Sequence, residues 1–287
     1  MRKTDFIVRP MQRGDIVYAM KLSNAESWNQ TEKDWKLLIE SPQNVCLVAE
    51  CNNKIIGTTT AMNYANRIAW IGMVLVAAEW RGQGVSKLLL TNILKKLESF
   101  PSIKLDATPA GQRVYEKFDF KDESRIARVV TGSMKNLSYD DDNTLAESIQ
   151  VKDIDEIISF DEQVFGTTRR PLIESLIKQY PQKAWMLKRN NSIAGFALGR
   201  EGYKYHHVGP VFASTIDDAK MLIRRALKEV INQPVVMDVP YDKENLITWL
   251  SSIGFTMQRH FVRMYKKENS LPGIVNKQYL ICGPEFG

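Results

Sequence analysis

The chain has 287 residues, of which 44% are hydrophobic and 25% are charged, and its formal net charge at pH 7 is +6. This length suits two domains of ordinary size. No apolar run approaches the roughly 20 residues of a membrane-spanning helix, and the opening residues, MRKTDFIVRP, contain no apolar signal-peptide region. We therefore expect a cytoplasmic protein with no membrane partner.

Cysteine and charge distribution exclude further classes of protein. Cys46, Cys51 and Cys282 are odd in number and lack metal-ligand spacing, so we expect neither a disulfide scaffold nor a metal site. Residues 1–140 contain 20 Lys and Arg against 15 Asp and Glu, whereas the remainder contains 19 against 18. The basic excess favours an anionic ligand in the first part of the chain. Clustered basic residues beside a recognition motif are missing, so we expect no nucleic-acid partner.

Apolar periodicity predicts a mixed α/β organisation for the first part of the chain. Strands are expected at 6–9, 45–50, 54–62, 67–76, 103–107 and 120–130, and helices at 13–24, 31–40, from 87 onward, and at 109–117. Asn52-Asn53 suits a hairpin turn. Thr31 with Asp34 fits a helix N-cap followed by an acidic residue. Residues 133–148 are polar and acidic, which indicates a linker.

A basic, glycine-rich turn lies between a predicted strand and a predicted helix, in residues 74–87, VLVAAEWRGQGVSK. The first N–H groups of a helix lack internal acceptors and lie at the positive end of its dipole, and glycines let a polyanion approach the backbone. The spacing fits neither a P-loop nor a dinucleotide fingerprint, because Lys87 occupies the third glycine position of the latter. The turn therefore predicts a phosphate site of another kind, unless it is only a tight connection.

Two motifs resemble those of the GNAT superfamily of acyl-CoA-dependent N-acyltransferases. Arg81, Gly84 and Ser86 resemble its R-x-x-G-x-G/A pattern, with Ser in the last position. Residues 106–120, DATPAGQRVYEKFDF, are similar to its second signature, a strand followed by a helix with a tyrosine, with Asp119 in place of a glycine. The resemblance implies an α/β (α+β) fold in which helices flank a mixed, mainly antiparallel sheet. It also implies acetyl-CoA as cosubstrate.

The same resemblance implies site residues. Tyr115 aligns with the tyrosine that protonates the leaving thiolate. The segment between the first two strands lines the acceptor side in this family, so Glu26, Trp28 and Asn29 are candidates for binding the acceptor. The resemblance also implies that the cofactor is bound by main-chain groups of the strand and by the turn. These residues are Val74, Leu75, Val76, Arg81, Gly82, Gln83, Gly84, Val85 and Ser86.

The general base stays open. The strand at 67–76 contains no Asp or Glu, although many relatives carry a carboxylate there. Within the first half, the alternatives are Glu26, Asp34 or a chain of water molecules. The alternatives from the second half are Asp161, His206 and His207.

The second half repeats the first weakly, at offsets that drift as loop insertions and deletions would produce. Matched pairs are Asp15 with Asp153, Gly57 with Gly195, Lys87 with Lys220, Asp106 with Asp238, and Phe120 with Phe255. At these offsets residues 81–84 become Ser214 to Asp217, and Tyr115 becomes Leu250. The second copy thus loses the glycines and the tyrosine and gains carboxylates that repel phosphate. We interpret it as a degenerate GNAT-like domain that shapes the acceptor site or contributes dimer contacts.

These observations predict a GNAT domain at 1–135, a linker at 136–147 and a degenerate GNAT-like domain at 148–287. The final residues 283–287, GPEFG, resemble the ending of two-domain bacterial proteins of this type. The predicted function is transfer of acetyl from acetyl-CoA to a primary amine of a small molecule or peptide. The alternatives are a non-catalytic acyl-CoA-binding sensor or scaffold and an aminoacyl or peptidyl transferase. The near-neutral second half argues against the latter, which would need a basic groove.

Overall fold

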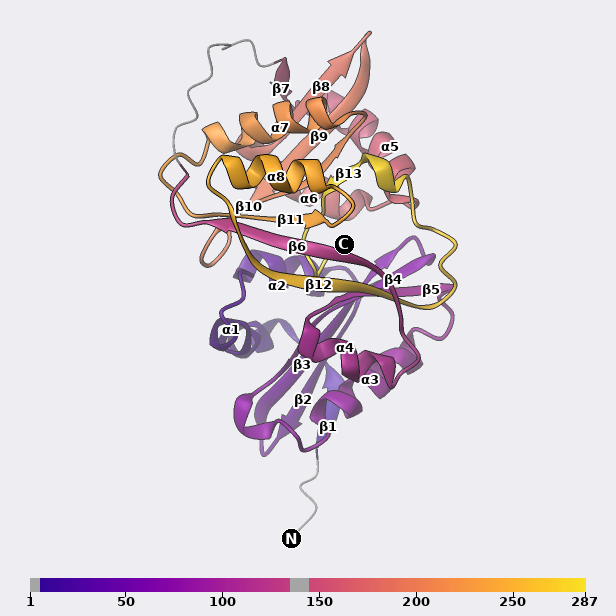
Figure 1. Ribbon diagram of the computed structural model, residues 1–287. Coiled ribbons are helices and arrows are strands. Elements are labelled where there is room, and N and C mark those ends of the chain that lie inside the picture. The colour runs from indigo at the N-terminus through magenta and orange to yellow at the C-terminus, as the bar shows by residue number, and fades with distance from the viewer. Residues whose placement is uncertain (1–5, 135–144) are drawn as a thin grey trace.

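The computed structural model describes residues 6–134, here called the first half, and 145–287, the second half. Within them, strands of both halves form one 13-stranded sheet (Figure 1). The first half contains β1 (Ile7–Pro10), α1 (Ile16–Ala25), α2 (Glu32–Glu40), β2 (Val45–Cys51), β3 (Lys54–Tyr64), β4 (Ile68–Val76), α3 (Val85–Lys96), β5 (Ser102–Ala107), α4 (Pro109–Glu116) and β6 (Lys121–Thr131). The second half contains β7 (Ala146–Ser148), α5 (Ile154–Phe165), α6 (Arg170–Gln179), β8 (Trp185–Arg189), β9 (Ser192–Arg200), β10 (His206–Ala213), α7 (Ile216–Lys228), β11 (Val235–Pro240), α8 (Glu244–Ser252), β12 (Thr256–Lys267) and β13 (Gln278–Leu280).

The local signals in the first half act as predicted. Asn52 and Asn53 form the β2–β3 turn with φ of 48° and 60°, as a tight hairpin of this kind requires. The Thr31 amide donates to Asp34 Oδ2 at 2.6 Å, which completes the predicted capping box of α2. The expected linker at 136–147 lies outside the described residues up to 144, and Ala146 and Glu147 belong to β7.

The centre of the sheet is built by both halves. β12 inserts between β5 and β6, and β6 lies between β12 and β11, all in antiparallel pairs. In Figure 1 these two long strands run side by side across the middle of the molecule. The halves therefore share one sheet. β6 of the first half pairs with β11 of the second half, and β12 of the second half pairs with β5 of the first, so we call β6 and β12 the exchanged strands.

Two matching ion pairs fix the exchanged strands. Arg128 on β6 binds Asp238 on β11 through two hydrogen bonds of 2.8 Å. Arg263 on β12 binds Asp106 on β5 in the same way, at 2.9 and 3.0 Å. Both carboxylates are fully buried. Leaving either carboxylate unpaired would be costly, about 3–5 kcal/mol, so the pairs select this strand order.

The largest core joins the two halves. Tyr64 and Trp70 of the first half pack with Phe165 and Phe212 of the second half, and Phe286 near the end of the chain is fully buried among them. Tyr64 Oη donates to the Phe286 carbonyl at 2.7 Å. The last residues of the chain are therefore part of the interior.

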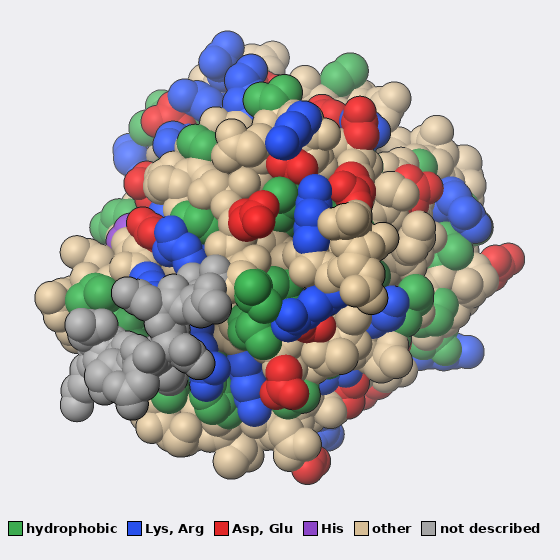
Figure 2. Space-filling model, turned by 90° about the horizontal axis from the view of Figure 1, so that it is seen from above, with side chains coloured by type: hydrophobic (Ala, Val, Ile, Leu, Met, Phe, Trp, Pro, Cys, Tyr) green, Lys and Arg blue, Asp and Glu red, His purple; other side chains and the backbone are tan. Residues whose placement is uncertain are grey.

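Acidic and basic side chains are interspersed over the face of the second half that Figure 2 presents. This agrees with the nearly balanced charge of that half. Among the described residues, no helix combines the length and apolar character needed to cross a bilayer.

Candidate active site

A bulge in β4 opens a slot in the sheet. Thr58 and Thr60 of β3 pair with Leu75 and Gly72 of β4, so two residues of β4 oppose one residue of β3. Met73, one of the two, has φ of 52°. Pairing of β4 with β5 stops at Ile71, so the main chain of residues 74–76 faces no strand on that side within the described part of the chain. The Val76 carbonyl accepts from Arg81 Nε at 3.2 Å, and the other main-chain groups on this side are available to a ligand.

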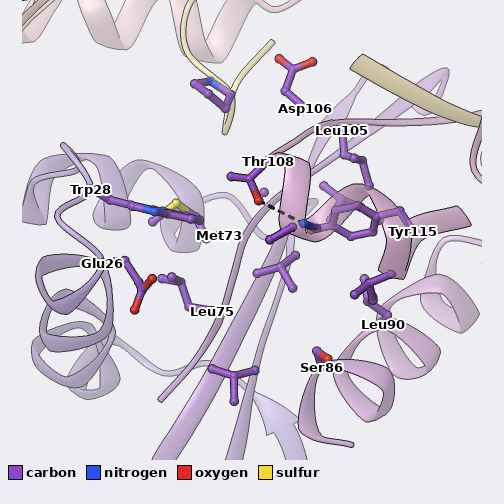
Figure 3. A pocket seen from close by; sticks show the side chains of 18 of the residues that line it. Glu26, Trp28, Met73, Leu75, Ser86, Leu90, Leu105, Asp106, Thr108 and Tyr115 are labelled. Carbon is purple, nitrogen blue, oxygen red and sulfur yellow. Dashed lines mark hydrogen bonds between the residues drawn. The ribbon is translucent and has the colours of Figure 1, made fainter. Parts of the chain in front are cut away.

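The slot belongs to a cavity of about 460 Å³. One wall is β4 with the end of the α1 region, and the opposite wall is formed by α3, β5 and α4. Glu26 and Trp28 reach the cavity from one side and Tyr115 from the other (Figure 3). A further side of the cavity is lined by residues of the exchanged strands β6 and β12 and of the C-terminal segment. These are Arg128, Arg259, Phe261, Pro284 and Glu285.

Residues 81–86, here called the cradle, fit a polyanion. Gly82 and Gly84 have φ of 75° and 87°, and a Cβ at either position would meet no atom within 4 Å. Gly84 is the N-cap of α3, yet no side chain caps this helix and its first turn contains no acidic residue. The first amides of α3 are therefore open to an anion. Arg81 lies beside them, and its guanidinium is ion-paired with Glu26. The cradle residues fit the pyrophosphate of coenzyme A.

The equivalent region of the second half is closed. β10 and β11 separate after His207, but β13 fills the gap by pairing with β10 at Val211 and Phe212. Thr215 caps α7 by accepting from the Asp218 amide at 3.1 Å. The second half thus keeps the scaffold, while its own chain occupies the slot and its helix start is capped.

Tyr115 is half-buried on α4, with its ring edge-to-face against Phe120 at 5.9 Å. Thr108 caps this helix by accepting from the Gly111 amide at 3.2 Å. Burial raises the pKa of the Tyr115 hydroxyl above its ordinary value. The hydroxyl therefore stays protonated at neutral pH and can act as a proton donor.

Most of the predicted site residues line the cavity, but two of them do not. Glu26 and Trp28 line the cavity with all the predicted cofactor-binding residues except Gln83, whose side chain donates to the Glu79 carbonyl at 3.0 Å. Asn29 does not line it: its amide binds main-chain groups of Lys204 and Tyr205.

The other residues considered as bases are engaged away from the cavity. Asp34 binds Arg200, with Oδ1 and Nε at 3.1 Å, and Asp161 binds Arg169 at 2.7 Å. His206 contacts Lys183 at 2.8 Å, and His207 lies 3.4 Å from Asp238. None of these side chains lines the cavity.

Sequence reasoning missed the residues that the second half brings to the cavity. Arg259 is half-buried, and no hydrogen bond or ion pair engages it among the described residues. Burial, followed by the charge of nearby Arg128, lowers its pKa. Phe261 lies beneath the Arg128 guanidinium, 4.9 Å from its ring centre. No local motif marks these residues, because only the exchanged strand places them here.

Comparison with known proteins agrees with this architecture. Two models of the acetyltransferase (GNAT) domain match residues 18–132 and 157–280. The chain belongs to the GNAT superfamily of acyltransferases and carries two GNAT domains.

Among its relatives is the holothin acyltransferase of Pseudoalteromonas sp. (strain SANK 73390), which is 24% identical over 92% of this chain and 88% of its own. A crystal structure from Pyrococcus horikoshii matches with a TM-score of 0.82 and 19% identity, over 98% of this chain and 96% of its own. A tandem GNAT protein from the clavulanic acid biosynthesis pathway matches with a TM-score of 0.66 and 10% identity, over 92% and 98%. These two structures support the fold.

Proposed function

We propose that the protein transfers an acyl group, most simply acetyl, from coenzyme A to a primary amine of a small molecule or peptide by direct attack. The observation that carries this proposal is the open slot between β4 and β5, which runs from an uncapped helix start to a half-buried tyrosine. Because β13 fills the corresponding slot of the second half, the proposal places the reaction in the first half.

Different residues of the chain would bind the cofactor and donate the proton. Main-chain amides of the cradle would hold the pyrophosphate, with Arg81 adding charge, and the free edge of Val74 to Val76 would align the pantetheine arm. Acetyl-CoA, when bound, supplies the thioester. Tyr115 would donate a proton to the departing sulfur, whose reference pKa of about 8.5 makes protonation favourable at neutral pH.

The acceptor side suits an amine with an apolar body and a negatively charged group. Trp28 and Phe261 offer aromatic surface, and Arg259 is a cation without a partner among the described residues. A buried charge gains most from an opposite charge on the ligand. The relative named for holothin makes holothin a further acceptor to test.

Release of free thiol from acetyl-CoA, measured with a panel of amines, tests the proposal. The panel pairs phenylalanine with phenethylamine and lysine with cadaverine, so that each pair differs by a carboxylate, and adds spermidine and holothin. We expect amine-stimulated release, faster for the carboxylate-bearing member of each pair. Calorimetric binding of coenzyme A without turnover of any amine would instead support the sensor alternative.

A further inference from the structure

The C-terminal segment passes from the closed slot of the second half into the cavity of the first. β13 pairs with β10, and the chain then continues to Pro284, whose carbonyl accepts from Trp70 Nε1 at 3.0 Å. Glu285 follows and packs against β4: a Cβ added to Gly72 would lie 3.0 Å from the Glu285 Cα. Gly72 comes directly before the bulge residue Met73, so this carboxylate-bearing residue lies beside the point where the slot opens.

The Glu285 carboxylate has one satisfied and one free oxygen. The side chain is 2% exposed, and its Oε1 accepts from Arg200 Nη2 at 2.5 Å. Oε2 is buried and has no hydrogen-bond partner among the described residues. Buried carboxylate oxygens without donors are costly. Because Glu285 lines the cavity, a ligand can supply the missing donor.

The charge around Glu285 favours a cation as that donor. Arg200 is shared between Glu285 and the buried carboxylate of Asp34, so these three groups together carry one negative charge. Arg200 on β9 pairs with Glu285 and with Asp34 on α2. Arg128 on β6, Tyr64 on β3 and Cys282 in its own segment lie close enough to Glu285 to interact with it electrostatically. Arg128 is already paired with Asp238. An ammonium group at Oε2 would balance the charge.

We propose that Glu285 is the general base: it receives the proton of the acceptor amine, the role for which β4 itself has no carboxylate. This inference rests on the proposed function. Glu285 Oε2 takes one proton from the ammonium group and passes it to water. The free amine nitrogen then forms a bond to the thioester carbonyl carbon, and the carbon–sulfur bond breaks as Tyr115 gives a proton to sulfur. Water carries the second nitrogen proton to Tyr115, and the products are an amide, a free thiol and one proton released to solvent.

The test compares wild type with Glu285→Gln in the pH profile of kcat/KM, using the panel amine that the wild type acetylates fastest. We expect a loss of about 100-fold at pH 7 that shrinks as the pH approaches the amine's own pKa, because free amine then needs no base. Calorimetry without acyl-CoA adds a readout independent of turnover. Glu285→Gln should bind the amine about tenfold more weakly and its N-acetyl form unchanged, because only the amine is charged.

Asp34→Asn is the matched control, because Asp34 contacts the same arginine without lining the cavity. We expect it to lower stability and leave the shape of the pH profile as in wild type. If Glu285→Gln does not fold, Glu285→Asp replaces it: the charge for Arg200 is kept, and kcat should still fall, because the shorter side chain withdraws the oxygen from the amine. If Glu285→Gln keeps full activity, or loses activity equally at every pH, the inference about Glu285 is wrong and the proposed function still stands. A wild type that acetylates no amine overturns the proposed function, and the inference falls with it.

Discussion

Arg81 and Glu26 form an ion pair across the cavity, between the cradle and the end of the α1 region. Arg81 is 51% exposed, and the pair engages the guanidinium expected to contact phosphate. Glu26→Gln should therefore tighten the binding of coenzyme A by up to about fivefold, since an exposed pair of this kind is worth about 0.2–1 kcal/mol.

Titration calorimetry measures this effect, with Glu32→Gln as control, because Glu32 pairs with Lys36 on α2 and does not line the cavity. Arg81→Met should weaken binding. Weaker binding by Glu26→Gln would show that the carboxylate supports the cofactor site instead of competing for Arg81.

Gly84→Ala should reduce the affinity for coenzyme A by about tenfold, which corresponds to 1.4 kcal/mol. Gly84 has φ of 87° at the start of α3, where a side chain strains the backbone that presents the amides. Gly14→Ala is the control, because Gly14 lies in open space without a positive φ.

Wild type should bind one coenzyme A per chain in the same titration, since β13 fills the second slot. Two sites per chain, or equal affinity in wild type and Gly84→Ala, would contradict the assignment of the cradle.

Tyr115→Phe should lower kcat by about 100-fold and leave the affinity for coenzyme A nearly unchanged. The phenyl ring keeps the packing against Phe120, so the loss reports the hydroxyl. Steady-state kinetics and calorimetry separate the two quantities, and Tyr18→Phe, an exposed position on α1, is the control. If Tyr115→Phe and wild type turn over equally fast at all pH values, Tyr115 is not the proton donor.

Stability should fall as the pH drops from 7 to 5. Burial, followed by the charge of Arg200, lowers the pKa of His207, and burial followed by Lys183 lowers that of His206. Below about pH 6.5 these two histidines are therefore protonated in the unfolded chain but still neutral in the folded chain. The free energy of unfolding then decreases as the pH falls through this range.

Urea denaturation at pH 7, 6 and 5 measures this loss. His207→Gln should flatten the dependence more than His206→Gln, because His207 is the more deeply buried of the two. A free energy of unfolding that stays constant over this range would refute the expectation.

Much of the cofactor side could be predicted from the sequence. The cradle depends on glycines within a few residues and on a helix start, and the capping box of Thr31 and Asp34 lies within one helical turn. Tyr115 follows Thr108, which caps the same short helix. Hydrogen bonding, backbone dihedral angles and apolar periodicity act over such distances, so the residues themselves indicate the local structure.

The acceptor side could not be predicted in this way. Asn29 appeared to be a pocket residue, but its amide binds main chain 175 and 176 residues away. Glu285 lies against Gly72 only because the C-terminal segment is buried between the halves. Such contacts depend on which strands pair and in which register, and local pattern carries no information about that choice.

The sequence by itself determined a glycine-rich turn at a helix start, a helix that carries Tyr115, and a second copy without the glycines and the tyrosine. The tertiary structure decided that β6 and β12 are exchanged, that β13 fills the spare slot, and that Arg259 and Glu285 reach the cavity. The physical reason is that matched buried ion pairs and a shared core favour this arrangement across more than a hundred residues of intervening chain.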